Sequence, residues 1–191
     1  AGRFGSGPTL LGVLDRTRTP MGGRLLRRWL GQPLLERDEL EGRLDMLSWF
    51  HESAIRRGEA GRLLAGISDL ERLVNRVRSG VALPREAVAL GRGLALVPEF
   101  RALLAEGDAP PGGDDAALRP CPEVIDLIAR ALVDDPGPVG GQAGVIRDGF
   151  SPELDEVRRA SREAREYIAG LERQERERTG IGSLKVGYNR V

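Results

Sequence analysis

Residues 151–180 read SPELDEVRRASREAREYIAGLERQERERTG, and this stretch decides the fold class. Ser151 is a residue type that caps helices, and Pro152 suits the first helical position, where its missing N–H costs nothing. Gly180 is the residue type that most often ends a helix. The sequence therefore predicts one uninterrupted helix over 152–179, which would be roughly 42 Å long at 1.5 Å per residue.

One face of this predicted helix carries apolar and small residues at alternating spacings of three and four, as in a short heptad seam. The seam residues are Leu154, Val157, Ser161, Ala164, Ile168 and Leu171. The far end, 170–179, is almost wholly charged, and Leu171 is its only large apolar residue. Acidic and basic residues such as Glu172 and Arg176 are spaced i, i+4, which favours pairing within the helix. We therefore expect an exposed helix that projects from its domain.

The residues before this stretch also show a helical period, which predicts a bundle of shorter helices. Leu10, Leu11 and Leu14 form a short apolar turn that Asp15 closes. One further helix is predicted from Pro20 to Gly31, with Thr19 as its cap. Two more are predicted to follow caps at Asp38 and at Ser68-Asp69. The last two are predicted to start at Pro84 and to run from Pro122 to about Val133. The stretches 107–120 and 134–150 are rich in Gly, Pro and Asp and predict loops.

Three of these helices carry an apolar stripe on one face, and we expect the second and third stripes to be buried. The stripes are Met21, Leu25, Leu26, Trp29 and Leu30; then Leu40, Leu44 and Leu47; then Leu70, Leu73, Val74 and Val77.

After Gly180 the pattern changes to an alternation of apolar and polar residues. Leu184, Val186 and Tyr188 alternate with other residues, which predicts the start of a β-strand. A lone strand is not a plausible end for a natural protein, so we expect this chain to be a fragment. The expected architecture is all-α, with a helical core over 1–150, a long helix over 151–180, and the truncated start of a further domain over 181–191.

Composition excludes several classes of function. The 29 basic and 29 acidic residues give a net charge of zero, so no net field attracts the chain to nucleic acid or to a membrane. Cys121 is the only cysteine and His51 the only histidine, which excludes an intramolecular disulfide and cysteine/histidine zinc sites. No apolar run approaches the ~20 residues that span a bilayer, and the N-terminus has no signal-peptide core. We expect a soluble, intracellular protein without a membrane partner.

No stretch matches a catalytic or nucleotide-binding motif. Lys185 lies between Leu184 and Val186, so the Gly-Lys-Ser/Thr of a phosphate-binding loop is absent. Gly91-Arg92-Gly93 matches only the start of a dinucleotide fingerprint and lies inside a helical pattern. The basic cluster Arg16, Arg18, Arg24, Arg27 and Arg28 is expected to be a solvated face paired with acidic residues elsewhere. His51 and Cys121 are expected to be ordinary side chains, so we expect no catalytic, cofactor-binding or metal-binding residue.

Three stretches resemble the MutS family of DNA mismatch repair proteins. They are LLGVLDRTRTPMGGRLLRRWL at 10–30, followed by Pro33-Leu34 and by the helix with Arg43-Leu44-Asp45; GVIRDGFSPELD at 144–155; and ERERTGIGSLKVGYN at 175–189, which is the most specific. Their order and separation also match, so the resemblance covers nearly the whole chain.

The resemblance implies a place within a larger protein. It implies a helical core, an outgoing lever helix and the first strand of a DNA clamp, in a parent that also has a mismatch-reading domain and an ATPase. It further implies that the parent uses ATP and Mg, forms a homodimer, binds mismatched duplex DNA, works with other mismatch repair proteins, and is cytoplasmic and associated with the nucleoid in a bacterium. No catalytic or base-reading residue of the family falls on a position of this chain.

Two alternatives from other classes remain open at this point. One is a helical adaptor that binds a partner helix through the seam over 154–171. The other is a small arginine-rich enzyme that uses carboxylates, which would require a pocket with a strongly perturbed Asp or Glu pair.

Overall fold

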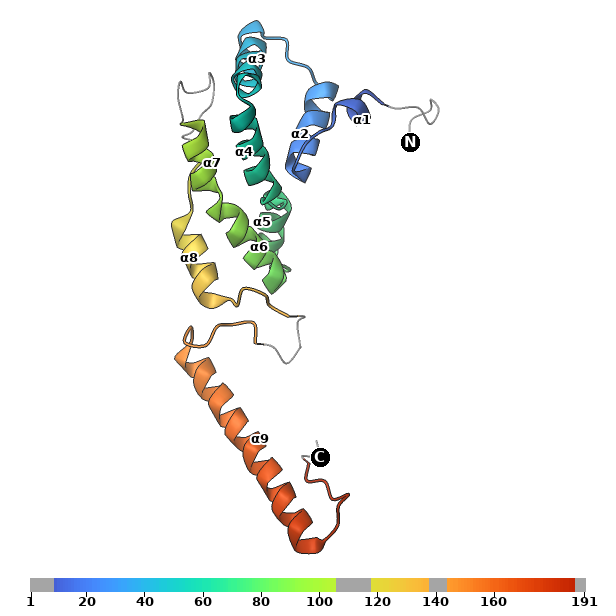
Figure 1. The fold of residues 1–191 in the computed structure, drawn as a ribbon, viewed down its shortest axis with the longest axis vertical. Coiled ribbons are helices and arrows are strands. Elements are labelled where there is room, and N and C mark those ends of the chain that lie inside the picture. The colour runs from blue at the N-terminus through green and yellow to red at the C-terminus, as the bar shows by residue number, and fades with distance from the viewer. Residues whose placement is uncertain (1–8, 106–117, 138–143, 188–191) are drawn as a thin grey trace. The chain divides into compact units, whose positions relative to one another are not determined.

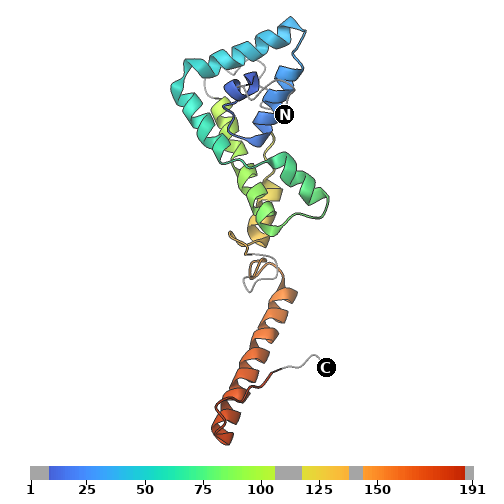
Figure 2. The same cartoon turned by 90° about the vertical axis from the view of Figure 1, so that its right-hand side faces the viewer.

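In a computed structural model of the chain, residues 9–105, 118–137 and 144–187 are described. Within these ranges the chain forms helices and loops and no β-sheet (Figures 1 and 2), which confirms the all-α prediction. The chain divides into two compact units, residues 1–145 and 146–191.

The described helices of the first unit alternate with short connections. They are α1 (Leu10–Leu14), α2 (Pro20–Gly31), α3 (Arg37–Glu52), α4 (Ala54–Ala65), α5 (Leu70–Arg78), α6 (Pro84–Ala95), α7 (Val97–Leu104) and α8 (Pro122–Ala131). The sequence patterns did not predict α4 and α7. Each follows the preceding helix after a single residue, Ser53 or Leu96, so no loop signal separates it from its neighbour.

Two predicted helix starts are confirmed in atomic detail. The Thr19 side chain accepts a hydrogen bond from the Gly22 amide at 3.0 Å, and Pro20 occupies the first turn of α2. The Asp69 side chain accepts a hydrogen bond from the Arg72 amide at 3.2 Å and caps α5. In both helices the cap satisfies a backbone donor that the first turn leaves without an intrahelical partner.

The predicted cap at Asp38 is wrong. Helix α3 begins at Arg37, and Glu36 stands at the cap position without a side-chain capping bond. Asp38 lies inside the first turn, where its carboxylate still interacts favourably with the helix N-terminus.

The buried residues of the first unit come from several helices. The buried hydrophobic residues are Trp49, Ala60, Leu63, Leu73, Val88, Leu90 and Leu103. Ala60 and Leu63 of α4 form one cluster with Leu103 of α7, and half-buried Phe50, Leu96 and Phe100 pack against it. The buried members of this cluster lie on the two helices that the sequence patterns did not predict.

The buried stripe predicted for α3 is wrong. Leu40, Leu44 and Leu47 are 40%, 59% and 64% exposed, and Trp49 is the buried residue of this helix. In α5 the prediction holds for Leu73 and fails for Val74 and Val77, which are exposed. In α2, which has no buried residue, Leu25, Trp29 and Leu30 are also exposed. An apolar period identifies a face of a helix, and it does not establish that this stretch of chain covers that face.

Two glycines in α6 allow close helix packing. A Cβ on Gly91 would lie 3.0 Å from Ile128 Cγ2 of α8, and a Cβ on Gly93 would lie 2.8 Å from Leu70 Cδ2 of α5. Figure 1 shows α5, α6 and α8 side by side. Gly91-Arg92-Gly93 is therefore part of a helix packing surface inside α6, which excludes it as the start of a phosphate-binding turn.

The second unit is built on α9 (Pro152–Thr179), which has the predicted bounds. The Ser151 hydroxyl accepts a hydrogen bond from the Leu154 amide at 3.3 Å, and Gly180 ends the helix in a left-handed conformation with φ of +72°. None of the residues of α9 is buried.

The predicted strand after Gly180 is not present over 184–187, and 188–191 lie outside the described residues. Instead, the Leu184 carbonyl accepts a hydrogen bond from Arg176 Nε at 2.7 Å, and the Val186 amide donates to Glu172 Oε2 at 3.2 Å. The backbone groups of a β-strand form hydrogen bonds to a neighbouring strand. Here the Leu184 carbonyl and the Val186 amide form hydrogen bonds to side chains of α9 instead.

Candidate functional site

The first candidate site is the joint at the start of α9, where the preceding loop is tied to the helix. The Gly149 amide donates a hydrogen bond to Asp155 Oδ2 at 2.7 Å, and Gly149 has φ of +87°, which favours glycine. Arg158 donates to the Asp148 carboxylate at 2.8 Å and to the Ile146 carbonyl at 3.1 Å. These bonds connect the first two turns of the helix to residues 146–149 of the preceding loop.

The electrostatics of this joint favour a negative charge at the helix start. A backbone hydrogen bond, assisted by the Ser151 hydroxyl, lowers the pKa of Glu153 below its ordinary value. Ser151 Oγ donates to Glu153 Oε2 at 2.9 Å while it accepts from the Leu154 amide. The first turn is therefore capped and correctly charged for a helix N-terminus.

The second candidate site is the opposite end of α9, where the chain turns back along the helix (Figure 1). Arg176 pairs with Glu172 one turn earlier and also donates to the Leu184 carbonyl. The Thr179 hydroxyl donates to the Glu175 carbonyl at 2.6 Å, and Gly180 N–H donates to the Arg176 carbonyl at 2.9 Å. Two hydrogen bonds, from Arg176 to the Leu184 carbonyl and from the Val186 amide to Glu172, thus fasten the returning segment to the end of the helix.

Between the two joints, α9 is exposed and carries its own charge pairs. Val157 and Tyr167 are 65% and 69% exposed, whereas Leu154, Ile168 and Leu171 are half-buried. Pairs at i, i+4 and i, i+3 spacing confirm the expected pattern, and they are Glu172 with Arg176, Arg159 with Glu163, and Glu175 with Arg178. Exposed pairs of this kind each add only a few tenths of a kcal/mol. The continuity of α9 therefore rests mainly on its backbone hydrogen bonds and its two fastened ends.

The residues considered for chemistry lie far apart along the chain. His51 is exposed in the last turn of α3, and its carbonyl accepts a hydrogen bond from Arg57. Cys121 is half-buried at the cap position of α8, and its sulfur contacts the Arg119 carbonyl at 3.7 Å. Lys185 is exposed after α9. The described hydrogen bonds of His51 and Cys121 do not join these two residues to each other.

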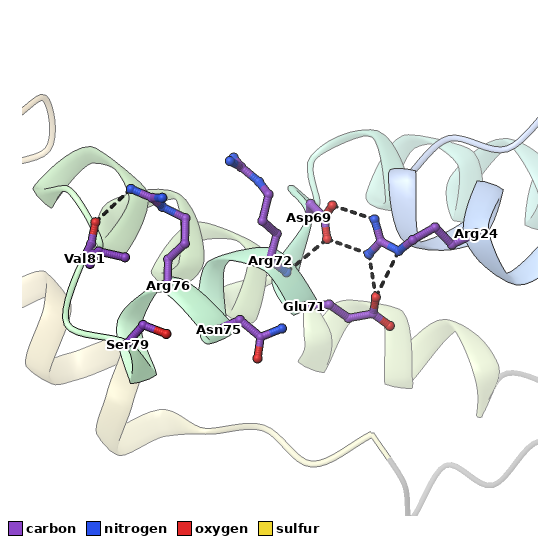
Figure 3. A pocket seen from close by; sticks show the side chains of 8 residues that line it. All are labelled: Arg24, Asp69, Glu71, Arg72, Asn75, Arg76, Ser79 and Val81. Carbon is purple, nitrogen blue, oxygen red and sulfur yellow. Dashed lines mark hydrogen bonds and ion pairs between the residues drawn. The ribbon is translucent and has the colours of Figure 1, made fainter.

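Within the basic cluster, Arg24 has the acidic partners that were expected (Figure 3). Its guanidinium donates to both oxygens of Asp69 at 2.8 Å each and also to Glu71. Arg16, Arg18, Arg27 and Arg28 are exposed. The side-chain hydrogen bond from Arg24 lowers the pKa of Asp69 to about 2. The partners could not be identified in advance, because they lie 45 and 47 residues away in the sequence.

The described carboxylates do not form the pair that an acid–base enzyme requires. A carboxylate acts as an acid near neutral pH only if its pKa is raised. Arginine hydrogen bonds instead lower the pKa of Asp69 and of Glu59, and hydrogen bonds from the Leu83 amide and Arg76 lower that of Glu86. These groups are permanent anions in structural ion pairs.

The described residues also do not fit magnesium or a nucleotide phosphate. No cluster of three His, Cys, Asp or Glu side chains suitable for a metal is found over 9–105, 118–137 and 144–187. The sequence has no Gly-Lys-Ser/Thr to hold a β- or γ-phosphate and its magnesium ion.

A separate observation concerns membranes. In the part of the chain that the structure describes, none of the helices has the length and apolar character needed to cross a bilayer.

Comparison with known proteins gives a consistent result over the length of the chain. Residues 2–182 match the model of MutS domain III. The chain is 44% identical over 186 residues to the DNA mismatch repair protein MutS of Dehalococcoides mccartyi, an alignment that covers 96% of this chain and 21% of that protein.

Relatives from the genus Thermus are at least as similar. The chain is 46% identical to MutS of Thermus thermophilus and 48% identical to MutS of Thermus aquaticus, in each case over 184 residues, 96% of this chain and 22% of the relative. The chain thus spans about a fifth of the length of the curated relatives that it matches.

Proposed function

The chain belongs to the MutS family, and we propose that it forms the part of a DNA mismatch repair protein that links DNA binding mechanically to ATP hydrolysis. In this proposal α9 is a lever. One end is fixed to the loop over 146–149, and the other end leads toward a DNA clamp that begins in the residues after Gly180.

The observation that carries this proposal is the construction of α9. It is a single helix of 28 residues with no buried residue, and it is fastened at both ends by side-chain and backbone hydrogen bonds. A helix that exists to build a core buries one face. A helix that stays continuous without burying a face, and that has both ends secured, is suited to transmit displacement from one end to the other.

The activities of the whole protein are also part of this proposal. We expect an ATP- and Mg-dependent parent that acts as a homodimer on mismatched duplex DNA together with other repair proteins. In a bacterium its place of action would be the cytoplasm, at the nucleoid. The residues of this chain would contribute neither the nucleotide site nor the base-reading contacts.

An exposed apolar face supports a larger assembly. Leu40, Leu44 and Leu47 lie on one exposed stripe of α3. Isolated exposed leucines are ordinary, whereas a helical stripe of them indicates a missing contact. Because the chain spans about a fifth of its relatives, we propose that other parts of the parent polypeptide cover this face. The family assignment favours this over an adaptor that binds a foreign helix.

A proline in the middle of the lever tests the proposal in the full-length parent. Ala164 is exposed near the centre of α9, so Ala164→Pro removes a backbone hydrogen bond and kinks the helix, at a cost of roughly 3 kcal/mol, without disturbing a core. Ala164→Ser is the matched control, because it changes the same exposed position and keeps the helix.

The measurement is steady-state ATP hydrolysis with and without mismatched duplex, after folding has been checked by circular dichroism. We expect Ala164→Pro to keep basal hydrolysis and to lose most of the change that mismatched DNA induces, while Ala164→Ser keeps both. A folded proline variant with the DNA response of the wild type would show that α9 does not transmit the signal.

A further inference from the structure

The segment over 9–31, which contains α1 and α2, is attached to the rest of its unit in an unusual way. Neither α1 nor α2 has a buried residue. Among the described helices, the close packing pairs are α3 with α4, α4 with α7, and α6 with α5, α7 and α8, whereas α2 packs closely only against α1. The apolar side chains of α2 are therefore only partly covered, with Leu25, Trp29 and Leu30 still 37–38% exposed.

Charged groups add two specific attachments. Arg24 of α2 forms hydrogen bonds to both carboxylate oxygens of Asp69 and to Glu71 at the start of α5 (Figure 3). Further along α2, the guanidinium of Arg43 from α3 stacks over the Trp29 ring at 3.8 Å. Both attachments depend on an arginine, and both bridge to a helix outside the segment.

The Asp69 carboxylate has two roles at once. Its Oδ1 caps α5 through the Arg72 amide at 3.2 Å, and the same oxygen accepts from Arg24. The Asp69 side chain is only 14% exposed, whereas Arg24 is 47% exposed. Arg72 is the other cation close to this carboxylate. A bidentate, charge-assisted pair with one shielded partner is stronger than an ordinary surface pair, yet it remains accessible to ions.

We propose that residues 9–31 form a strap that Arg24, Asp69 and Glu71 latch onto α5, and that ionic strength releases the strap while the rest of the unit stays folded. An apolar cluster of the unit is built from Ala60, Leu63 and Leu103, and none of the latch residues belongs to it. Salt weakens the ion pairs and leaves that apolar cluster intact. The latch thus gives the unit a docked and an undocked arrangement.

Hydrogen exchange of the 191-residue chain tests this latch, with Arg24→Gln as the main variant. We expect the amides of α2 to exchange roughly five- to tenfold faster in Arg24→Gln than in the wild type at low salt. The difference is expected to fall below about twofold in 1 M NaCl, where the Debye length is about 3 Å. Amides of Leu63 and Leu103 are expected to exchange equally in both proteins.

Two further variants make the result specific. Asp69→Asn keeps a capping oxygen for the Arg72 amide and removes the charge, while Glu71 remains a partner of Arg24. Exchange in α2 is therefore expected to lie between that of the wild type and that of Arg24→Gln, while α5 stays protected. Arg28→Gln removes another exposed arginine of α2 and is expected to exchange like the wild type. The proposal is overturned if Arg24→Gln leaves α2 exchange unchanged at low salt, if the difference persists in 1 M NaCl, or if α2 and the core exchange together.

Discussion

The guanidinium of Arg158 lies 2.8 Å from the carboxylate of Asp148, ten residues earlier in the chain. The same guanidinium donates to the Ile146 carbonyl, and its side chain is only 24% exposed. One residue therefore connects the second turn of α9 to the loop that enters it. In a lever this connection determines how movement of the helix is passed to its base.

Removal of this connection should loosen the base of the helix without unfolding it. Arg158→Gln removes the charged fork that holds Asp148, so we expect the Gly149 amide, which Asp155 holds, to exchange roughly tenfold faster. Arg165→Gln changes an exposed arginine further along α9 and is the matched control. Hydrogen exchange of the Gly149 amide is measured in the wild type and in both variants. If Arg158→Gln exchanges at the same rate as the wild type, Arg158 does not hold the joint.

The far end of α9 depends on a glycine in a left-handed conformation. Gly180→Ala forces a Cβ into φ of +72°, which we expect to cost about 1 kcal/mol and to increase fraying of the last turn. Gly170→Ala is the matched control, because this helical position has no neighbouring atom within 4 Å of the added Cβ. Alanine there should stabilise the helix by roughly 0.5–1 kcal/mol.

Thermal unfolding followed by circular dichroism distinguishes the two glycine variants. The predicted signs are opposite, with a lower transition temperature for Gly180→Ala and a higher one for Gly170→Ala. A shift in the same direction for both would contradict the assignment of Gly180 as the left-handed end of the helix.

These two ends were predictable because the signals are local. Ser151 and Gly180 are the residue types that begin and end helices, and each acts on backbone groups within one turn. Thr19 was identified in the same way. The Arg24–Asp69 pair could not be predicted, because it joins residues 45 positions apart and no period or motif connects them.

The stripe Leu40, Leu44 and Leu47 shows a second limit of sequence reasoning. The periodic pattern identified the apolar face correctly, but this chain does not bury it. The strand predicted after Gly180 is likewise absent over 184–187. Its alternating pattern is that of a strand in a sheet, and the described residues contain no second strand with which it could pair. Both patterns are consistent with a stretch of sequence that is adapted to a longer polypeptide.

The pH dependence of the latch follows from the lowered pKa of Asp69. Its pKa is about 2 in the folded chain because Arg24 stabilises the charged form, compared with an ordinary value of 3.8. The stabilisation is therefore complete above about pH 5 and is lost as the pH falls through about 2. We expect about 1 kcal/mol from this group, since Arg24 is 47% exposed.

Exchange of α2 amides across this pH range, corrected for intrinsic rates, provides the measurement. The loss of protection between pH 5 and 2 should be smaller in Asp69→Asn, which has no charge to lose. An identical pH dependence in wild type and variant would assign the acid sensitivity to other carboxylates.

The isolated chain should neither bind ATP nor discriminate mismatched DNA. Its net charge is zero, α9 pairs its own charges, and the sequence has no Gly-Lys-Ser/Thr. Non-specific binding to duplex DNA depends on neutralising phosphates, so we expect weak binding that disappears at physiological salt. Calorimetry with ATP and gel shifts with G·T and fully paired duplexes test this, and saturable ATP binding or a preference for G·T would contradict it.

The central claim is that α9 moves as a rigid body, and the distance between two spin labels on it tests this most directly. Glu156 and Glu177 are exposed positions near opposite ends of α9, and their 21-residue separation corresponds to roughly 31 Å along a helix. The labels would be placed by Glu156→Cys and Glu177→Cys in the full-length parent, with Cys121 and any other cysteine replaced.

Double electron–electron resonance would be recorded without DNA, with mismatched duplex, and with mismatched duplex and ATP. If α9 is rigid, we expect one narrow distance distribution near 31 Å in all three states, and a broadened, shorter one when Ala164→Pro is added. A wild-type distance distribution that shortens or broadens when DNA or ATP binds would contradict the rigid lever, because α9 would then bend and could not transmit displacement between its ends.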